Sequence, residues 1–223
     1  MQHLAIYDMD KTITAAPTWT RFLMHAARVR APWRLALMPL AGVAGLGYLL
    51  KLIDRTELKQ LSQRLLLGRA VVAADLESVA ETFAAAEIAN GVLHGARERI
   101  EADRAAGYRL VMATASHGYY AAAIARLLGF DDVVATQARR DGQGRILSVI
   151  EGDNCYGPAK LRMIESWMQR AGIARGDMHV RAYSDHVSDA PLLEWADEGF
   201  AVNAHGPLQA LAAARGWPLL DWR

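Results

Sequence analysis

The chain has 223 residues, 52% hydrophobic and 22% charged, a balance typical of a globular protein that forms one large domain or a core with an insertion. Its net charge of +1 argues against a nucleic-acid partner, and the single cysteine, Cys155, excludes an intramolecular disulfide framework. No basic stretch followed by an apolar stretch marks the N-terminus, so we expect no secretory signal and predict a cytoplasmic protein.

The first predicted element is a buried strand of a parallel sheet. An apolar run over residues 4–7 is followed at once by Asp8, Asp10 and Thr12. Ligands bind at the carboxyl edge of open α/β sheets, and two carboxylates placed there stay ionised beside a cation or tight hydrogen bonds. A hard cation such as Mg²⁺ suits oxygen ligands. Because a strand-end Asp is usually a turn former or a helix cap, this pair needs support from the rest of the chain.

Helical patterns then fill residues 16–89. Helices are predicted over residues 17–30, over 54–67 with Asp54 or Thr56 as the cap, and over 75–89. No strand is expected in this segment. We therefore predict an inserted all-helical cap domain, with residues 1–15 and 90–223 forming the core.

One part of this cap, residues 35–50, carries no charge and lies between Arg34 and Lys51. It is shorter than the roughly 20 apolar residues that cross a bilayer. The favoured interpretation is a buried helix pair bent at Pro39. The alternative is a surface that makes peripheral contact with a membrane or accepts an apolar substrate.

The remainder alternates between helices and strands, which predicts a doubly wound parallel sheet. Strands are expected over residues 108–113, 132–136, 179–183 and 198–202, with a hairpin of residues 136–139 and 145–150. Helices are expected over residues 96–106, 117–128, 158–171, 190–196 and 208–214. The tryptophans near the C-terminus are interpreted as packing residues.

This topology brings chemically useful side chains to one edge of the sheet: Asp8 with Asp10, Thr114 after the second strand, Lys160 in a first helical turn, and Asp185 with Asp189. Together they can supply a divalent-metal site, a hydroxyl donor, a fixed ammonium and a carboxylate nucleophile. Phosphoryl transfer depends on positioning and charge neutralisation of this kind, and Asp carboxylates accept phosphoryl groups covalently.

The motifs DMDKT (residues 8–12), ATAS (113–116), GPAK (157–160) and YSDHVSDAPLLE (183–194) occur in this order. The set resembles the haloacid dehalogenase-like (HAD) superfamily of hydrolases, subfamily IB, and is most similar to its phosphoserine-phosphatase-like branch. The resemblance covers nearly the whole chain. It implies a Rossmann-like α/β core with a helical cap inserted after the first motif.

Residue roles follow from that resemblance. Asp8 is expected to become an aspartyl phosphate, Asp10 to act as acid and base, and Lys160, with Thr114 and Ala115, to hold the phosphoryl group. The Asp8 carboxylate, the Asp10 carbonyl and Asp185 are expected to bind Mg²⁺. Asp189 is expected to support the site through a water or by orienting Lys160, although it could also cap the helix that follows.

The sequence departs from the family pattern at Pro17, where phosphoserine phosphatases carry a Glu that meets the substrate's amino group, and at Ser188, which replaces an Asn. The expected function is Mg²⁺-dependent hydrolysis of a small phosphorylated metabolite. A lipid phosphate of the phosphatidylglycerophosphate type, a non-catalytic binding protein and transfer to an acceptor other than water are the alternatives, and the oligomeric state is undetermined. Ser116 and His117 have no assigned role, while His186 and Cys155 are expected to be packing or surface residues rather than ligand and nucleophile.

Overall fold

A computed structural model describes residues 2–223 of the chain. Its strands are β1 (Gln2–Tyr7), β2 (Ala70–Val71), β3 (Arg109–His117), β4 (Asp132–Arg140), β5 (Ile146–Glu151), β6 (Met178–Ser184), β7 (Glu198–Val202) and β8 (Leu219–Leu220). Its helices are α1 (Thr18–Arg30), α2 (Met38–Leu49), α3 (Arg55–Leu66), α4 (Ala73–Asn90), α5 (His94–Ala105), α6 (Gly118–Leu127), α7 (Pro158–Arg170), α8 (Ala190–Trp195) and α9 (Gly206–Arg215), with 3-10 turns at Pro32–Leu37, Arg175–Asp177 and Val187–Asp189.

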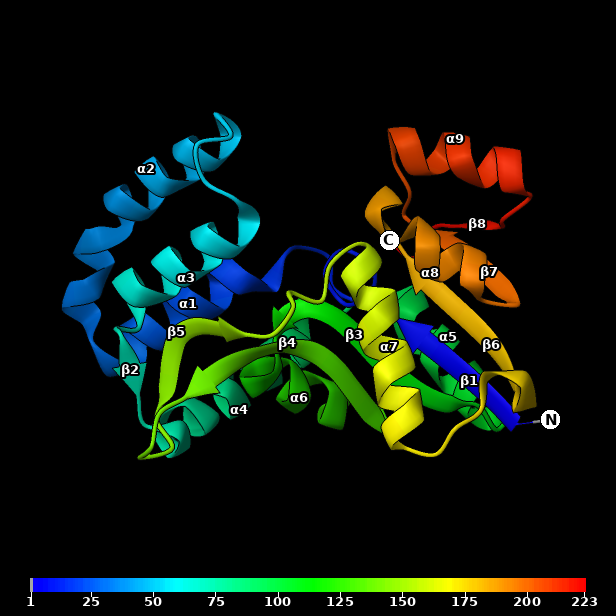
Figure 1. Cartoon of the computed structure of the whole chain (residues 1–223), viewed down its shortest axis with the longest axis horizontal. Coiled ribbons are helices and arrows are strands. Elements are labelled where there is room, and N and C mark those ends of the chain that lie inside the picture. Colours follow the sequence, from blue (N-terminus) through cyan, green and yellow to red (C-terminus); the bar gives the residue numbers. More distant parts are fainter. Residues whose placement is uncertain (1) are drawn as a thin grey trace.

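The strands form one sheet in the order β2-β5-β4-β3-β1-β6-β7-β8 (Figure 1). The pairs from β4 across β3, β1, β6 and β7 to β8 are parallel, whereas β5 is antiparallel to β4 and β2 is antiparallel to β5. This confirms the predicted doubly wound sheet. The hairpin of β4 and β5 extends the sheet towards the first three helices.

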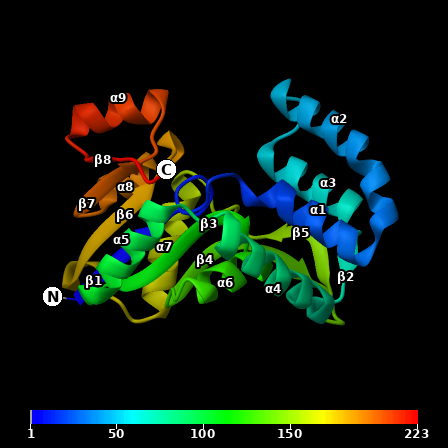
Figure 2. The ribbon, with the colours of Figure 1, turned by 180° about the vertical axis from the view of Figure 1, so that it is seen from behind.

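Helices cover both faces of the sheet, as Figures 1 and 2 show from opposite sides. Because side chains alternate along a strand, β1 serves both cores. Its Ala5 and Tyr7 belong to the cluster shared with α4, α5 and α6, and its Leu4 and Ile6 belong to the cluster shared with α7, α8 and α9. The strand is therefore buried from Leu4 to Tyr7, and its carboxyl end is fixed from both sides.

The inserted segment differs from the expectation in two ways. It contains the short strand β2, which pairs with β5, so the expectation of helix alone was wrong. Its last helix, α4, packs against α6, and Phe83 meets the ring of Tyr120 edge-on at 5.9 Å. The helices α1, α2 and α3 form a lobe beside β5 (Figure 1). The proposed cap of residues 16–89 stays a prediction.

The expectation of a buried helix pair bent at Pro39 was also wrong. Pro39 lies in the first turn of α2, where a missing N–H is tolerated, and the turn before it is a 3-10 helix. Within residues 38–49, all of which are described, Ala44 is the buried one. Among residues 2–223 no helix is long and apolar enough to cross a bilayer.

Smaller differences concern strand ends. The strand β3 continues past Thr114 to His117 through an irregularity in its pairing with β4, where a strand end and a helix start were expected. The strand β4 is continuous over Asp132–Arg140, where a strand followed by a hairpin arm was expected. The two-residue strand β8 was not expected. The buried Trp222 that follows it packs near Tyr7, which confirms a packing role for that tryptophan.

Candidate active site

Acidic side chains meet a lysine at the carboxyl edge of the sheet. Asp8 directly follows β1, Asp185 directly follows β6, and Asp189 ends the 3-10 turn after it. Lys160 lies in the first turn of α7, which begins at Pro158 after Gly157. Gly157 has φ of 59°, a conformation that side chains with a Cβ rarely adopt, so it allows the sharp entry that aims this turn at the sheet.

Lys160 forms a buried ion cluster with two of these acids. Its Nζ lies 2.6 Å from Asp8 Oδ1 and 2.5 Å from Asp189 Oδ2, and the lysine is 2% exposed. Burial alone lowers the pKa of Lys160, but Asp189 and Asp8 outweigh that effect and raise it overall. The ammonium is therefore permanently charged and fixed beside the Asp8 carboxylate.

Thr12 links Asp8 to Asp185. Its hydroxyl lies 3.1 Å from Asp8 Oδ2 and 3.3 Å from Asp185 Oδ1, and it accepts from the Asp185 N–H at 3.0 Å. Burial raises the pKa of Asp8 to about 7, against the opposing charge of Lys160, and burial likewise raises the pKa of Asp185. Two neighbouring carboxylates are thus held where their charged forms need further stabilisation.

Asp10 is held by partners that the sequence interpretation did not assign. Its Oδ1 accepts hydrogen bonds of 2.7 Å from both the backbone N–H and the hydroxyl of Thr18, and its Oδ2 accepts from the Ser116 hydroxyl at 2.9 Å. Tyr120 donates to the Ser116 hydroxyl at 2.6 Å. The Thr18 N–H belongs to the first turn of α1, where backbone N–H groups lack intrahelical partners. The start of α1 thereby fixes the Asp10 carboxyl.

The segment after β3's bend carries the predicted phosphate contacts, Thr114 and Ala115. Ala115 lines the cavity at the site. The Thr114 hydroxyl is fully buried and accepts from the Ser116 N–H at 3.0 Å, so it holds the shape of this segment. Lys59 of α3 donates to the Ala115 carbonyl and, at 2.8 Å, to Asn154 Oδ1. Burial lowers the pKa of Lys59 to about 7, with the charge of Arg55 adding to the shift.

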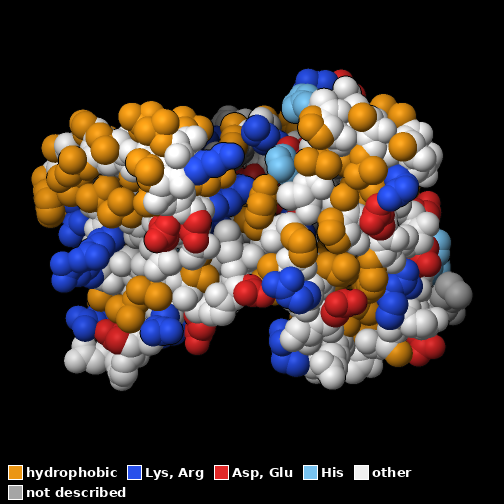
Figure 3. All heavy atoms as spheres, turned by 45° about the horizontal axis from the view of Figure 1, so that its top comes forward, with side chains coloured by type: hydrophobic (Ala, Val, Ile, Leu, Met, Phe, Trp, Pro, Cys, Tyr) orange, Lys and Arg blue, Asp and Glu red, His pale blue; other side chains and the backbone are white. Residues whose placement is uncertain are grey.

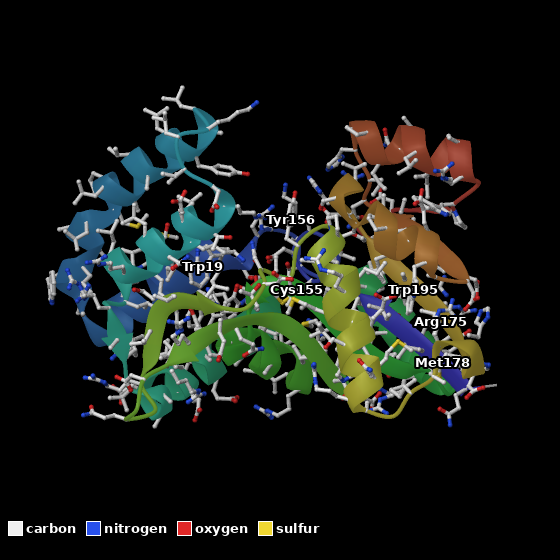
Figure 4. The ribbon with its side chains drawn as sticks, in the orientation of Figure 1. Trp19, Cys155, Tyr156, Arg175, Met178 and Trp195 are labelled. Atoms are coloured by element: carbon white, nitrogen blue, oxygen red, sulfur yellow. The ribbon has the colours of Figure 1, made fainter. Side chains whose placement is uncertain are left out.

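A cavity of about 230 Å³ opens at this point between the carboxyl edge of the sheet and the start of α3. Figure 3 shows a hollow between the two lobes at the same edge of the molecule. Tyr156 stands on the core side of the gap (Figure 4), and the guanidinium of Arg55 lies 4.0 Å from its ring centroid. The cavity is lined by Asp8, Asp10, Lys11, Pro17, Arg55, Ala115, Tyr156, Lys160, Asp185, His186, Ser188 and Asp189.

The donor set suits a hard cation. Among residues 2–223 no three His, Cys, Asp or Glu side chains are grouped to hold an ion. The family resemblance implies the carboxylates of Asp8 and Asp185 and a main-chain carbonyl as the ligand set. These acids share one hydroxyl and both have raised pKa values. Asp189 Oδ1 is buried without a hydrogen-bond partner in the described chain. An oxygen-rich, electron-rich site of this kind fits Mg²⁺.

Other residues singled out in the sequence have structural partners. Asp189 makes no side-chain cap of α8, and its carboxylate accepts from Ser184 as well as Lys160. His186 Nδ1 bonds the Ser188 hydroxyl at 2.8 Å. Cys155 is fully buried, and burial raises the pKa of its thiol to about 12, so it is a packing residue.

Comparison with known proteins identifies the family to which the sequence is similar. A model described as haloacid dehalogenase-like hydrolase matches residues 5–194. Protein CicA of Caulobacter vibrioides is 30% identical over 196 residues, which cover 87% of this chain and 83% of that protein. Phosphoserine phosphatase SerB1 of Mycobacterium tuberculosis is 32% identical over 176 residues, covering 74% of this chain and 55% of that protein. The chain thus spans little more than half the length of this mycobacterial relative.

Solved structures share the fold. A protein of unknown function from Bordetella pertussis Tohama I superposes over 100% of both chains with a TM-score of 0.90 at 26% identity. A substrate-bound phosphoserine phosphatase superposes with a TM-score of 0.64 at 17% identity, over 99% of this chain and 93% of that one. The second likeness concerns the fold alone.

Proposed function

The chain belongs to the haloacid dehalogenase-like hydrolase family, and from that premise we propose that it is a magnesium-dependent phosphomonoester phosphatase that works through an aspartyl phosphate on Asp8. The observation that carries the proposal is the buried pairing of Asp8 with Lys160, 2.6 Å apart, at a cavity that Asp10 also lines. A nucleophile, a fixed cation and a proton carrier are the groups that phosphomonoester hydrolysis requires.

In the first step the Asp8 carboxylate attacks phosphorus while the bond from phosphorus to the ester oxygen breaks. Lys160 neutralises charge on the phosphoryl oxygens, and Thr114 and Ala115 shape the segment expected to receive them. Asp10, held by Thr18 and Ser116, gives its proton to the departing alkoxide. The alcohol leaves, and the phosphoryl group is bound to Asp8 as an acyl phosphate.

In the second step Asp10, now a carboxylate, takes a proton from water as the water attacks the phosphoryl group. The acyl phosphate bond breaks, which returns Asp8 and releases inorganic phosphate. The Asp8 and Asp185 carboxylates and the Asp10 carbonyl would hold Mg²⁺, which supplies charge neutralisation for the phosphoryl group. Asp189 keeps Lys160 oriented through its ion pair with the lysine ammonium.

Two cavity residues bear on the substrate. Pro17 lines the cavity at the position where the related phosphoserine phosphatases carry a Glu, so the wall offers no carboxylate there to a substrate ammonium. Arg55 lines the same cavity and adds a positive charge. A small phosphorylated metabolite without that amino group suits this lining better than phosphoserine. A binding protein without activity would not need the fixed Asp10.

A phosphorylated lipid head group is the second candidate substrate, and the exposed leucines of α2 favour it. Measuring kcat/KM for soluble phosphomonoesters and for lipid phosphomonoesters in mixed micelles compares the two directly. A higher kcat/KM for the lipids would select the second candidate. The cytoplasmic location stays a prediction.

The nucleophile is tested by Asp8→Asn, with release of p-nitrophenol from p-nitrophenyl phosphate as the measurement. The amide cannot form the acyl phosphate, so we expect at least a roughly thousandfold loss of kcat. Asp153→Asn is the matched control, because Asp153 is exposed and pairs with Arg162 on the surface. An Asp8→Asn protein that is folded by circular dichroism and still turns over would remove the nucleophile assignment.

A further inference from the structure

The helix α2 exposes an apolar surface that the fold does not use. Val43, Leu49 and Leu52 have 65%, 74% and 75% of their surface exposed. We call the following set the apolar ridge: Leu40, Val43, Leu46, Leu49, Leu50 and Leu52. In Figure 3 hydrophobic side chains gather over this end of the cap lobe. Contiguous exposed apolar surface of this kind marks an interaction site.

In the stretch of sequence that carries the ridge, the charged residues are mainly basic. Residues 28–55 contain five basic side chains and one acidic side chain, in a chain whose net charge is +1. At the N-terminal side, the guanidinium of Arg34 lies 4.7 Å from the ring centroid of Trp33, which is 64% exposed. At the C-terminal side, Lys51 is exposed. An apolar surface flanked by an exposed tryptophan and by cations complements a bilayer interface with anionic lipids.

The shape of the ridge also favours a bilayer. Its members along α2 are three residues apart, so the exposed apolar surface turns around about half of the helix instead of forming one narrow stripe. A fluid bilayer can surround a convex apolar surface of this kind. The 12 residues of α2 span about 18 Å, which is too short to cross a bilayer but long enough to lie in its surface.

The ridge reaches the catalytic cavity. A groove of about 560 Å³ lies where α2 ends and α3 begins, and Leu49, Leu52 and Arg55 are among its lining residues. Arg55 also lines the cavity that holds Asp8. The side chain of Arg55 thus lies at the border between the apolar groove and the cavity of the proposed phosphatase site.

We propose that α2 and the turn after it form a docking surface for a bilayer that contains anionic lipids. This surface goes beyond the proposed chemistry, because it places the cavity mouth beside the lipid head groups whatever phosphomonoester is hydrolysed. The ridge inserts its leucines among the acyl chains, and the flanking cations meet the anionic head groups.

The experiment is co-sedimentation of the full chain with vesicles of phosphatidylcholine, with and without phosphatidylglycerol. The wild-type protein is expected to pellet with the anionic vesicles, more weakly at high salt, and least with phosphatidylcholine alone. The double variant Leu49→Gln with Leu52→Gln keeps the net charge and is expected to bind roughly tenfold more weakly, because two leucines no longer insert into the bilayer.

The matched control is Leu127→Gln with Val149→Gln, because both residues are exposed apolar side chains outside the cap and the charge is again unchanged. It is expected to bind as the wild type does. The proposal is overturned if the wild type stays in the supernatant or if the control loses as much binding as the ridge variant. It is equally overturned if light scattering shows a dimer that only the ridge variant dissociates, since a second copy would then be the occupant.

Two further measurements separate this proposal from the proposed function. The ridge variant is expected to hydrolyse p-nitrophenyl phosphate at the wild-type rate, and Asp8→Asn is expected to bind vesicles as the wild type does. Loss of vesicle binding with intact hydrolysis supports the docking surface. Hydrolysis that is absent in a wild type that binds vesicles overturns the phosphatase proposal and leaves the docking surface standing.

Discussion

Ser116 donates a hydrogen bond from its hydroxyl to Oδ2 of Asp10. In the described chain this is the only hydrogen bond to that oxygen. We expect Ser116→Ala to lower kcat roughly ten- to a hundredfold with little change in KM, because a hydrogen bond to a charged group contributes about 1.5–3 kcal/mol and this one positions the acid rather than the substrate. Steady-state kinetics with p-nitrophenyl phosphate measure both constants. Ser78→Ala, at an exposed position of α4, is the control. An unchanged kcat for Ser116→Ala would mean that Thr18 alone fixes Asp10.

The roles of Thr18, Ser116 and Lys59 were not predicted from the sequence. Asp8, Asp185 and Lys160 were identified because the predicted topology brings them to one sheet edge and because their motifs occur together in the order of a known family. A serine, a threonine or one more lysine is common, and each acquires its role here through a contact with a residue outside its own helix or strand. The position of Thr18 just after Pro17 at a helix start was a usable signal, since an N-terminal N–H can bind a carboxylate.

His117 is buried, and neither ring nitrogen has a hydrogen-bond partner among residues 2–223. Burial lowers its pKa to about 3, and the charge of Lys59 adds to the shift. Between about pH 6.5 and pH 3, His117 is protonated in the unfolded chain, where its pKa is near 6.5, but stays neutral in the folded chain. The free energy of unfolding therefore decreases as the pH falls through this range. At pH 5 this loss is about 2 kcal/mol relative to pH 7 or above.

Replacing this histidine should remove that part of the acid lability. We expect the free energy of unfolding of His117→Phe, measured in urea, to fall by about 2 kcal/mol less than that of the wild type between pH 7 and pH 5. The exposed His94 provides the control variant His94→Phe, which should keep the wild-type pH dependence. Identical slopes for His117→Phe and the wild type would show that the buried ring titrates normally.

At the scale of elements, Lys59 links α3 to Ala115 in β3 and to Asn154 in the loop before α7. We expect Lys59→Met to raise the inhibition constant of inorganic phosphate roughly tenfold, because the Ala115 carbonyl loses a donor and the site loses a charge. The effect should widen below about pH 7, where the ammonium form of Lys59 predominates. Lys51→Met, at an exposed position of the same cap, should leave inhibition by phosphate unchanged. An equal effect in both variants would assign the change to overall charge.

Element boundaries were predicted well where local chemistry fixes them. Asp54 caps α3 through a reciprocal capping box with Glu57, as the sequence suggested. The exposure of α2 was not predictable, because an uncharged segment has the same sequence pattern whether it packs in a core or lies on the surface. The strands β2 and β8 have two residues each, too few for any periodicity to be seen. Their pairing depends on neighbours distant in the chain.

At the scale of the whole molecule, the alternation of strands and helices was enough to predict the parallel sheet and its carboxyl edge. That topology joins Asp8 to Lys160 across 152 positions of sequence. The same reasoning could not give the shape of the cavity, because its far wall is built by cap residues such as Arg55. The order of elements in the sequence is enough to predict which residues meet at the sheet edge. The shape of a cavity that a second lobe closes depends on tertiary packing, which the sequence order does not give.

The acidic cluster at that edge makes a prediction about the stability of the whole fold. Burial raises the pKa values of Asp8 and Asp185 despite the charge of Lys160, so their charged forms weaken the folded state unless a second cation binds. Mg²⁺ that binds the folded chain alone should raise the free energy of unfolding by about 2.7 kcal/mol at a concentration a hundredfold above its dissociation constant. Urea unfolding with Mg²⁺ or with EDTA measures this difference.

The gain should be small in Asp185→Asn, which removes one of the two carboxylates, and should persist in the exposed control Asp153→Asn. If Asp185→Asn gains as much stability from Mg²⁺ as the wild type, the cation binds elsewhere on the molecule. Because the readout is unfolding rather than turnover, it tests the metal site independently of the aspartyl-phosphate chemistry. A cation that stabilises the fold through Asp185 would join the two separate strand ends of β1 and β6 in one charge-balanced site.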